Sequence, residues 1–283
     1  RDANGWNKTL FGGIDGAWVR LNTGSHVNVV ASTLLTGVAA KTRALNGTFL
    51  AGAFLEGGYG KYDTYNHFYL EPQHVNIRGK GNLTYFGLGF MARQTWDNGV
   101  WAEASIRGGF MQNRFHSGDY IIYLAGDRVT TARYRLDTPY VAGHLGLAKE
   151  WEVDEQNHFT LLGRYYYALQ GGKKINIAEE PVRFNADDLH RVRVGGRYTR
   201  VRDPYFSAYV GAYYEYGFSG KVRGSSQELH FPAPDLGGST GVGEIGIIAR
   251  SHRNERFSAE FGLQGYVGER LGVTGGVRFG WEF

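Results

Sequence analysis

The stretch GVTGGVRFGWEF, residues Gly272–Phe283, decides the fold of this chain. Every second position in it is apolar or glycine: Val273, Gly275, Val277, Phe279, Trp281 and Phe283. The positions between them are polar or glycine: Thr274, Gly276, Arg278, Gly280 and Glu282. Because successive side chains of a β-strand point to opposite faces, this pattern predicts a strand with one apolar face, ending in aromatic rings, and one polar face.

The same division recurs along the chain. In the segment 189–198, Val192 and Val194 alternate with Arg191 and Arg193. About twelve segments follow this pattern, and they cover residues 13–22, 27–42, 48–62, 82–96, 99–113, 137–152, 158–170, 188–201, 204–219, 240–250, 256–267 and 271–283. No stretch has the period of an amphipathic helix. Repeated alternating segments of roughly ten residues are typical of transmembrane β-barrels.

The connections between these segments alternate in length. Short turns are predicted at residues 45–47, 97–99, 154–157, 202–204 and 251–255, and two of them contain Asn-Gly, which favours tight hairpins. Longer polar links are predicted at residues 63–81, 114–136, 171–187 and 220–239, while the links at 22–26 and 268–270 are short. Outer-membrane barrels have short periplasmic turns and long outer loops, so the lengths indicate an orientation.

Composition excludes several other classes. The mean hydropathy of −0.36 is low for a membrane protein, but in a barrel only every second strand residue meets lipid. Cysteine is absent, which excludes disulfides and thiolate metal sites. The formal net charge of +4 is small for 283 residues and indicates no nucleic-acid partner. The first residues, 1–4, lack the apolar segment of a signal peptide.

A soluble β-sandwich also has alternating strands, so it is the alternative fold. Two features argue against it. The polar faces here carry charges in strand after strand, and aromatic residues stand at the strand ends. Trp96 and Trp101 flank one predicted turn, while Trp281 and Phe283 close the chain. Aromatic girdles of this kind mark membrane interfaces. The sequence therefore predicts an all-β, membrane-spanning, antiparallel up-and-down β-barrel of about 12 strands.

The polar faces supply the candidate site. By alternation, nine arginines and six glutamates point into the barrel: Arg20, Glu56, Arg93, Glu103, Arg107, Arg164, Arg191, Arg193, Arg197, Glu215, Glu244, Arg250, Glu260, Arg278 and Glu282. So many charges are too costly for a dry core but can pair and stay hydrated in a wet lumen. They form either a structural lattice of ion pairs or a mildly cationic path for a polypeptide, and the two are compatible.

Motifs for catalysis or cofactors are weak. The G-x-G-x-x-G of residues 241–246 is followed by no helical pattern, so these glycines are interpreted as strand features. The Gly-Gly-Lys-Lys of residues 171–174 lacks the phosphate-binding loop spacing. His144 and His190 stand alone, and no G-x-S-x-G occurs. We expect no catalytic centre, no cofactor and no metal site.

Several stretches carry a family resemblance. The segment 265–275, continuing through Phe279 to Phe283, looks like the last hairpin of autotransporter β-domains. Arg1-Asp2 followed by Gly16–Arg20 resembles the junction with the first strand, and the segments Pro204–Gly211 and Gly243–Gly246 fit in order and spacing. The chain therefore resembles the C-terminal β-barrel translocator domain of an autotransporter (type V secretion) over residues 12–283.

This resemblance implies a function and partners. Such a barrel anchors and helps to deliver its own N-terminal passenger across the bacterial outer membrane. It works as a monomer in outer-membrane lipid with the barrel assembly machinery and periplasmic chaperones, which read a terminal signal corresponding to Phe279, Trp281 and Phe283. The family has a helix inside the barrel, so residues 1–11 are expected to be a remnant of that helix or its linker. The alternatives are a small porin or solute channel and an outer-membrane hydrolase.

Overall fold

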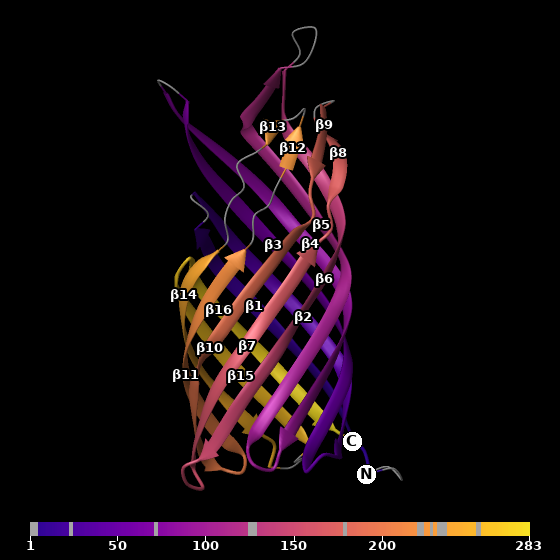
Figure 1. Cartoon of the computed structure of the whole chain (residues 1–283), viewed down its shortest axis with the longest axis vertical. Coiled ribbons are helices and arrows are strands. Elements are labelled where there is room, and N and C mark those ends of the chain that lie inside the picture. Colours follow the sequence, from indigo (N-terminus) through magenta and orange to yellow (C-terminus); the bar gives the residue numbers. More distant parts are fainter. Residues whose placement is uncertain are drawn as a thin grey trace.

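The computed structural model describes residues 5–22, 25–70, 73–123, 129–177, 180–219, 224–226, 229–230, 237–252 and 256–283. Twelve of the strands in this part form one closed barrel (Figure 1). They are β1 (Asn7–Asn22), β2 (His26–Arg43), β3 (Gly47–Leu70), β4 (Gln73–Trp96), β5 (Val100–Tyr123), β6 (Val129–Glu152), β7 (Asn157–Gln170), β10 (Asp187–Asp203), β11 (Phe206–Ser219), β14 (Gly238–Arg250), β15 (Phe257–Gly268) and β16 (Arg270–Glu282). The predicted fold class is confirmed.

Each barrel strand pairs antiparallel with its neighbours in the barrel order, and β1 pairs with β16 to close the wall. The closing register runs from Thr9 opposite Glu282 to Leu21 opposite Arg270. Closure satisfies the backbone groups that a sheet edge would expose to hydrocarbon. In the described residues, no helix is long and apolar enough to cross a membrane.

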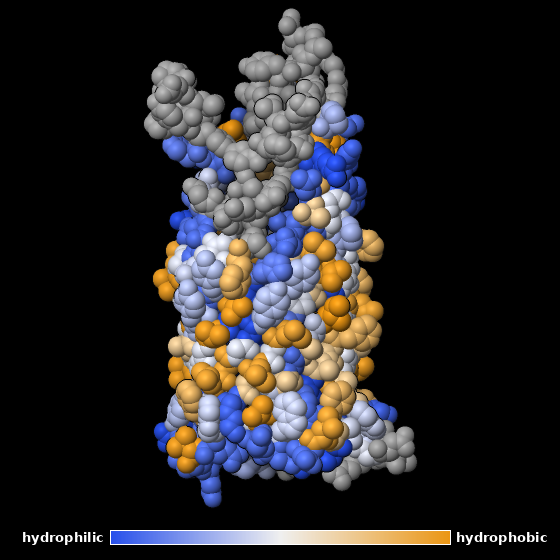
Figure 2. Space-filling model, viewed as in Figure 1, coloured by the Kyte–Doolittle hydropathy of each residue, from blue (hydrophilic) through white to orange (hydrophobic). Residues whose placement is uncertain are grey.

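The outer wall is apolar. Phe110 is 76% exposed, Trp18 67% and Leu145 62%, although each side chain is large and hydrophobic. Figure 2 shows such side chains gathered in a band around the middle of the barrel, with hydrophilic residues above and below. A patch of this extent belongs against lipid rather than water. Val194 and Phe261 lie on this wall, as the alternation predicts.

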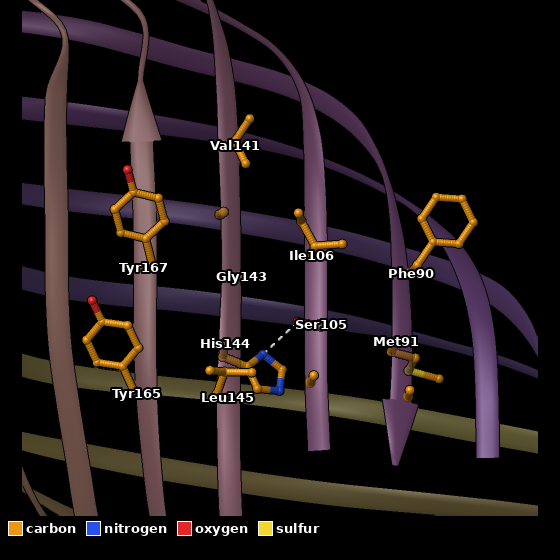
Figure 3. Close-up of a pocket in the computed structure, with 13 residues that line it drawn as sticks. Phe90, Met91, Ser105, Ile106, Val141, Gly143, His144, Leu145, Tyr165 and Tyr167 are labelled. Atoms are coloured by element: carbon orange, nitrogen blue, oxygen red, sulfur yellow. Dashed lines mark hydrogen bonds between the residues drawn. The ribbon is translucent and has the colours of Figure 1, made fainter. Parts of the chain in front are cut away.

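One part of the lipid-facing wall is hollowed. Small residues at Ala92, Ala104 and Gly143 leave an apolar groove of about 630 Å³ on the outside of β4–β7. Large side chains flank it (Figure 3): Phe90, Ile106, Val141, Leu145, Tyr165 and Tyr167. Because the groove opens towards the membrane, it provides lipid contact and is separate from the lumen.

Tight turns join the strands at the lower end in Figure 1, where both chain ends also lie. Ala44 donates a 3.0 Å hydrogen bond to the carbonyl of Gly47. The residues between them, Leu45 and Asn46, have φ of 50° and 52°. The turn predicted at 45–47 is confirmed, and its positive φ angles fall on Leu45 and Asn46 rather than on Asn46 and Gly47. At the β6–β7 turn, hydrogen bonds from the Asn157 side chain lower the pKa of the Asp154 carboxyl.

The opposite end differs from the prediction of long loops. Residues 63–81 and 114–136 are largely strand, because β3 and β4 stay paired up to Leu70 opposite Gln73. β5 and β6 pair as far as Tyr123 opposite Val129. A separate four-stranded sheet lies in the other two predicted links: β8 (Lys173–Ile177), β9 (Glu180–Phe184), β12 (Gly224–Ser226) and β13 (Leu229–His230). The ladder continues beyond the lipid, where nothing requires an apolar face.

The first strand also begins earlier than expected. β1 starts at Asn7, so residues 7–11 belong to the wall and the expectation of a helix or linker remnant over 1–11 is corrected for them. The reason is that Leu10 is 46% exposed and continues the lipid-facing row of Ile14 and Trp18. Leu10 also pairs with Trp281. Residues 1–4 of that expected segment lie outside the described residues.

Candidate functional site: the charged lumen

The inward faces of the strands build the site. Fourteen of the fifteen charged residues predicted to line the lumen have the inward parity of their strands, opposite to the exposed apolar side chains. They are Glu56, Arg93, Glu103, Arg107, Arg164, Arg191, Arg193, Arg197, Glu215, Glu244, Arg250, Glu260, Arg278 and Glu282. The alternation that lipid imposes on the outer wall therefore fixes the charged inner wall as well.

Arg20 is the exception, and its inward placement was wrong. It shares the face of Ile14 and Trp18 and pairs with Leu271, which is 47% exposed on the outer wall. Its Nε donates a 2.9 Å hydrogen bond to Asn28 Oδ1. At the upper end of β1 a long cationic side chain can reach water from the outer face, so the charge is tolerated there. The inward charge of β1 is instead Asp15, which parity with Ala17 and Val19 indicates.

Trp101 also lies on the other face from the one expected of an aromatic girdle. The register at the turn of residues 97–99 pairs Thr95 with Trp101 and places both inside. Trp101 is buried, and the Arg93 guanidinium lies 4.0 Å from its ring centroid. Trp96 keeps the outward parity of Phe90 on β4. Trp101 therefore contacts a cation of the lumen, whereas Trp96 faces outward. The sequence pattern did not distinguish these two tryptophans.

The most enclosed ion pairs centre on Glu215 of β11, which is 2% exposed. Arg193 Nη2 lies 2.6 Å from Glu215 Oε1, and Arg270 Nη2 lies 2.5 Å from Oε2. The Arg270 guanidinium also stacks 3.8 Å from the Tyr266 ring centroid. One carboxylate thus bridges two arginines from β10 and β16, on opposite sides of β11, and the trio keeps one net positive charge.

Glu244 of β14 forms a second centre. Arg197 donates to it through Nε at 3.2 Å and Nη2 at 2.8 Å, a side-on contact with both carboxylate oxygens. Tyr213 Oη donates at 2.8 Å and Gln264 Nε2 at 3.1 Å. The Arg197 guanidinium lies 4.1 Å from the Tyr209 ring. This carboxylate is fully partnered by fixed side chains.

The other half of the wall repeats the arrangement. Arg164 donates to Glu103, and His144 Nε2 lies 3.3 Å from the same carboxylate. On β3, Glu56 accepts a 2.7 Å hydrogen bond from Tyr140 and lies 3.4 Å from Arg107 Nε. Each of these four glutamates therefore has a cation and a second side-chain partner.

Towards the lower rim the ion-paired side chains become more exposed to solvent. Glu260 accepts a 2.7 Å hydrogen bond from Tyr209, and Arg278 stands 4.0 Å from it and 3.8 Å from Asp15. Glu282 pairs with Lys41 at 2.5 Å. These residues are more exposed, with 63% of the Arg278 side chain accessible to solvent. Within the described chain, Arg93, Arg191 and Arg250 have no ion pair, which leaves a cationic surplus along the wall.

Inward tyrosines need room, and glycines on neighbouring strands provide it. A Cβ on Gly246 would lie 2.3 Å from Tyr209 Cζ, and one on Gly87 would lie 2.2 Å from Tyr140 Oη. The G-x-G-x-x-G pattern has no phosphate role here. Gly246 makes space for the ring that bonds Glu260, whereas Gly243 faces the other way with nothing within 4 Å of an added Cβ.

One constellation has the composition of a hydrolase relay. Ser105 Oγ lies 2.7 Å from His144 Nδ1 (Figure 3), and His144 Nε2 approaches Glu103. A serine hydrolase also needs oxyanion donors at the nucleophile. β5 is paired on both sides of Ser105, with Met91 and with His144, so the neighbouring backbone amides are engaged in the sheet.

In the described residues no group of three His, Cys, Asp or Glu is placed to hold a metal ion.

The sequence reasoning missed several lumen residues. Arg270 was assigned to a link, although it has the same parity as Arg278 on β16. The tyrosines that bond the glutamates were also missed, because tyrosine occurs on both faces: Tyr213 is buried inside, whereas the adjacent Tyr214 is 50% exposed outside. Counting alternate positions from a neighbouring charge would have found both.

No family model and no curated protein matches the sequence. Solved structures share the fold. The β-domain of the Bordetella autotransporter BrkA is 15% identical, with a TM-score of 0.68 over 98% of this chain and 99% of that one. The translocator domain of the autotransporter NalP from Neisseria meningitidis is 12% identical, with a TM-score of 0.70 over 100% and 90%.

An outer membrane channel from Pseudomonas putida F1 is also similar, at 9% identity and a TM-score of 0.55 over 99% of this chain and 96% of that one. The two autotransporter domains therefore fit this barrel better than the channel does. In its fold, this chain is similar to the β-domain and the translocator domain of these two autotransporters.

Proposed function

We propose that this chain is the outer-membrane anchor and translocator pore for an N-terminal passenger. The observation that carries the proposal is the match in fold with the BrkA β-domain, which extends over 98% of this chain and 99% of that domain. Neither barrel has a large part left over, so the likeness covers the whole unit rather than a few hairpins.

The lumen chemistry fits the passage of a polypeptide. An extended polypeptide needs hydrogen-bond partners for its backbone wherever the lumen leaves too little water to hydrate it. Tyrosine hydroxyls and guanidinium groups along the wall provide donors, and the glutamates provide acceptors. Because the charges at Glu215 and Glu244 are already neutralised by arginines, the wall is polar without binding a passing chain tightly.

The proposed partners include the barrel assembly machinery and periplasmic chaperones. Phe279, Trp281 and Phe283 are 42%, 45% and 58% exposed at the end of the last strand, on the outer face. Deleting Phe283 should reduce outer-membrane assembly in cells strongly and refolding into detergent only slightly. An equal loss in both would assign the residue to stability, worth roughly 1.5–3 kcal/mol when fully buried, and not to recognition.

The main experiment tests transport directly. A signal peptide and an epitope-tagged passenger are fused before Arg1, and protease accessibility of the epitope is measured on intact Gram-negative cells. The same passenger on the Phe283 deletion is the control for assembly. We expect surface exposure of the epitope on the complete barrel. Folded barrel in the outer membrane with the epitope held in the periplasm would contradict translocation.

A solute channel is the second candidate, because a polar lumen and the Pseudomonas putida channel fold suit it as well. Planar-bilayer conductance separates the two. A translocator with its native upstream segment inside the lumen should conduct less than residues 1–283 alone. Equal conductance with and without that segment would favour a solute channel.

A further inference from the structure

The outer surface of β3–β6 changes character above the apolar band. One row across these strands is still apolar: Gly57, Phe86, Phe110 and Pro139. Four residues further along each strand, the outward row is Lys61, Asn82, Arg114 and Arg135. The next outward row is Asp63, Lys80, His116 and Arg133. We call Lys61, Lys80, Arg114, His116, Arg133 and Arg135 the basic rows.

The basic rows have few anionic neighbours: Asp63 lies directly opposite Lys80 in the same row, and Asp137 lies two residues from Arg135 on β6. In the described part of the chain, Arg135 alone among them forms an ion pair, with Asp137 at 3.1 Å. Arg114 lies directly opposite Arg135, and His116 lies opposite Arg133. Like charges in directly opposed positions destabilise a sheet. The cluster therefore keeps a net positive charge, because its six basic side chains have only these two carboxylates beside them.

The surface is also shaped and stiff. The basic rows line a groove of about 870 Å³, to which β8 contributes Asn176. On the other side of the same strands the rings of Tyr62, Phe115 and Tyr134 stack with centroids 6.5 and 5.2 Å apart. Tyr134 continues to Phe184 of β9 at 5.3 Å. This aromatic stack holds the extended hairpins together, so the cations are presented in fixed positions.

The height of the basic rows identifies the ligand. Four residues along a strand rise by about 13 Å, which a tilt near 45° reduces to about 9 Å along the membrane normal. That distance places the first basic row in the headgroup zone above the apolar row, and the second row, two residues further along each strand, stands about 14 Å above it, at the outer edge of that zone. Arginine and lysine there meet phosphate, which guanidinium groups bind through paired hydrogen bonds.

We propose that the basic rows are a binding site for the phosphate groups of phosphorylated lipids in the outer leaflet. The proposal rests on the outer-membrane placement in the proposed function but not on passenger transport. Charge complementarity, the groove and its position just above the lipid-facing wall together specify a lipid headgroup rather than a soluble anion.

The test uses the complete purified chain in a zwitterionic detergent and native mass spectrometry with diphosphorylated lipid A as the probe. The variant is Arg114→Gln with Arg133→Gln. The matched control is Arg200→Gln with Arg202→Gln, two exposed arginines on β10 near the opposite rim. Cations at membrane surfaces contribute about fivefold each, so the variant should bind about 25-fold more weakly and the control should bind as the unmodified chain does. Heat-dependent gel mobility verifies that each variant is folded.

Further probes separate the possible ligands. Monophosphorylated lipid A should bind more weakly than the diphosphorylated form, and phosphatidylcholine weakest of all. Inorganic phosphate that binds as tightly as the lipid, or polyglutamate that binds more tightly, would overturn the lipid assignment. Equal loss of lipid A binding in the variant and the control would overturn the site. If lipid A binds as expected while the passenger fusion stays in the periplasm, the proposed function alone fails.

Discussion

The lumen and the outer surface of the extended hairpins both carry arginines, but these arginines differ in how far nearby carboxylates neutralise them. Inside, Glu215 is enclosed by Arg193 and Arg270, and Glu244 by Arg197 and two neutral donors. Outside, Arg114 faces Arg135 across a strand pair, and Arg135 has an ion pair with Asp137 while Arg114 has none among the described residues. The inner glutamates are all paired with cations, whereas the outer cations outnumber the carboxylates beside them. Whether a charged side chain is neutralised therefore depends on its neighbours and on the solvent or lipid around it, and hardly at all on whether it is an arginine or a glutamate.

The largest expected effect comes from breaking an inner centre. In Glu215→Gln, Arg193 and Arg270 lose their shared anion while they stay enclosed. Removing one partner of a buried pair costs about 3–5 kcal/mol. Urea titration of the barrel folded in phospholipid vesicles should show a loss of that order. Glu282→Gln at the exposed rim is the control and should cost under about 1 kcal/mol. Similar losses for both would mean that the lumen water screens all pairs alike.

The next effect contrasts two adjacent positions of β10. Arg193 is buried inside, whereas Val194 is 47% exposed on the outer wall. Val194→Arg should therefore destabilise the barrel by about 2–4 kcal/mol if the site lies near the membrane midplane. Val194→Leu keeps the apolar surface and serves as the control. The same urea titration measures both, and a stable Val194→Arg variant would contradict the assignment of this face to lipid.

A smaller effect concerns the space for the lumen tyrosines. Gly246→Val would drive a side chain into the Tyr209 ring and separate its hydroxyl from Glu260, with a cost of about 1–3 kcal/mol. Gly243→Val is a matched control on the same strand, because an added Cβ there meets nothing within 4 Å. We expect the first variant to unfold at lower urea and the second to match the unmodified chain. The reverse order would show that these glycines serve the curvature of the wall.

How far the sequence predicts this molecule depends on the medium around each segment. Within the lipid band the alternation is enforced on both faces, so Val194 and Arg193 could be assigned correctly. Beyond the band neither face must be apolar, and the long extensions of β3–β6 were predicted as loops although Tyr, Thr and Val in them favour strands. Arg20 fails for the same reason, since the upper end of β1 no longer excludes a charge.

Which side chains pair inside the lumen was harder to predict from the sequence than which face of a strand each residue occupies. Arg270 binds Glu215 along the inner wall of the barrel, although the two residues are 55 positions apart in the sequence. No local sequence pattern encodes a contact of that separation. The register between strands decides which carboxylate meets which arginine, and it depends on turn lengths. In the turn at 45–47, for example, the positive φ angles fall on Leu45 and Asn46 rather than on Asn46 and Gly47. The sequence therefore predicts which residues line the inner wall but does not predict which of them pair with one another.

The smallest expected effect tests the outer charges. If Arg114 is held against Arg135 only by the fold, Arg114→Gln should leave the free energy of unfolding unchanged or raise it slightly, by about 0.5 kcal/mol, because a like-charge opposition is removed. The gain should vanish in 1 M salt, where the screening length falls to about 3 Å. Arg135→Gln is the control, since it also removes the 3.1 Å pair with Asp137 and should show no gain. Adding diphosphorylated lipid A should reverse the order and make the unmodified chain the more stable one, because a ligand that binds only the folded state stabilises it. If Arg114→Gln lost stability in the absence of lipid, the outer arginines would be paired within the protein after all, and the contrast with the lumen would disappear.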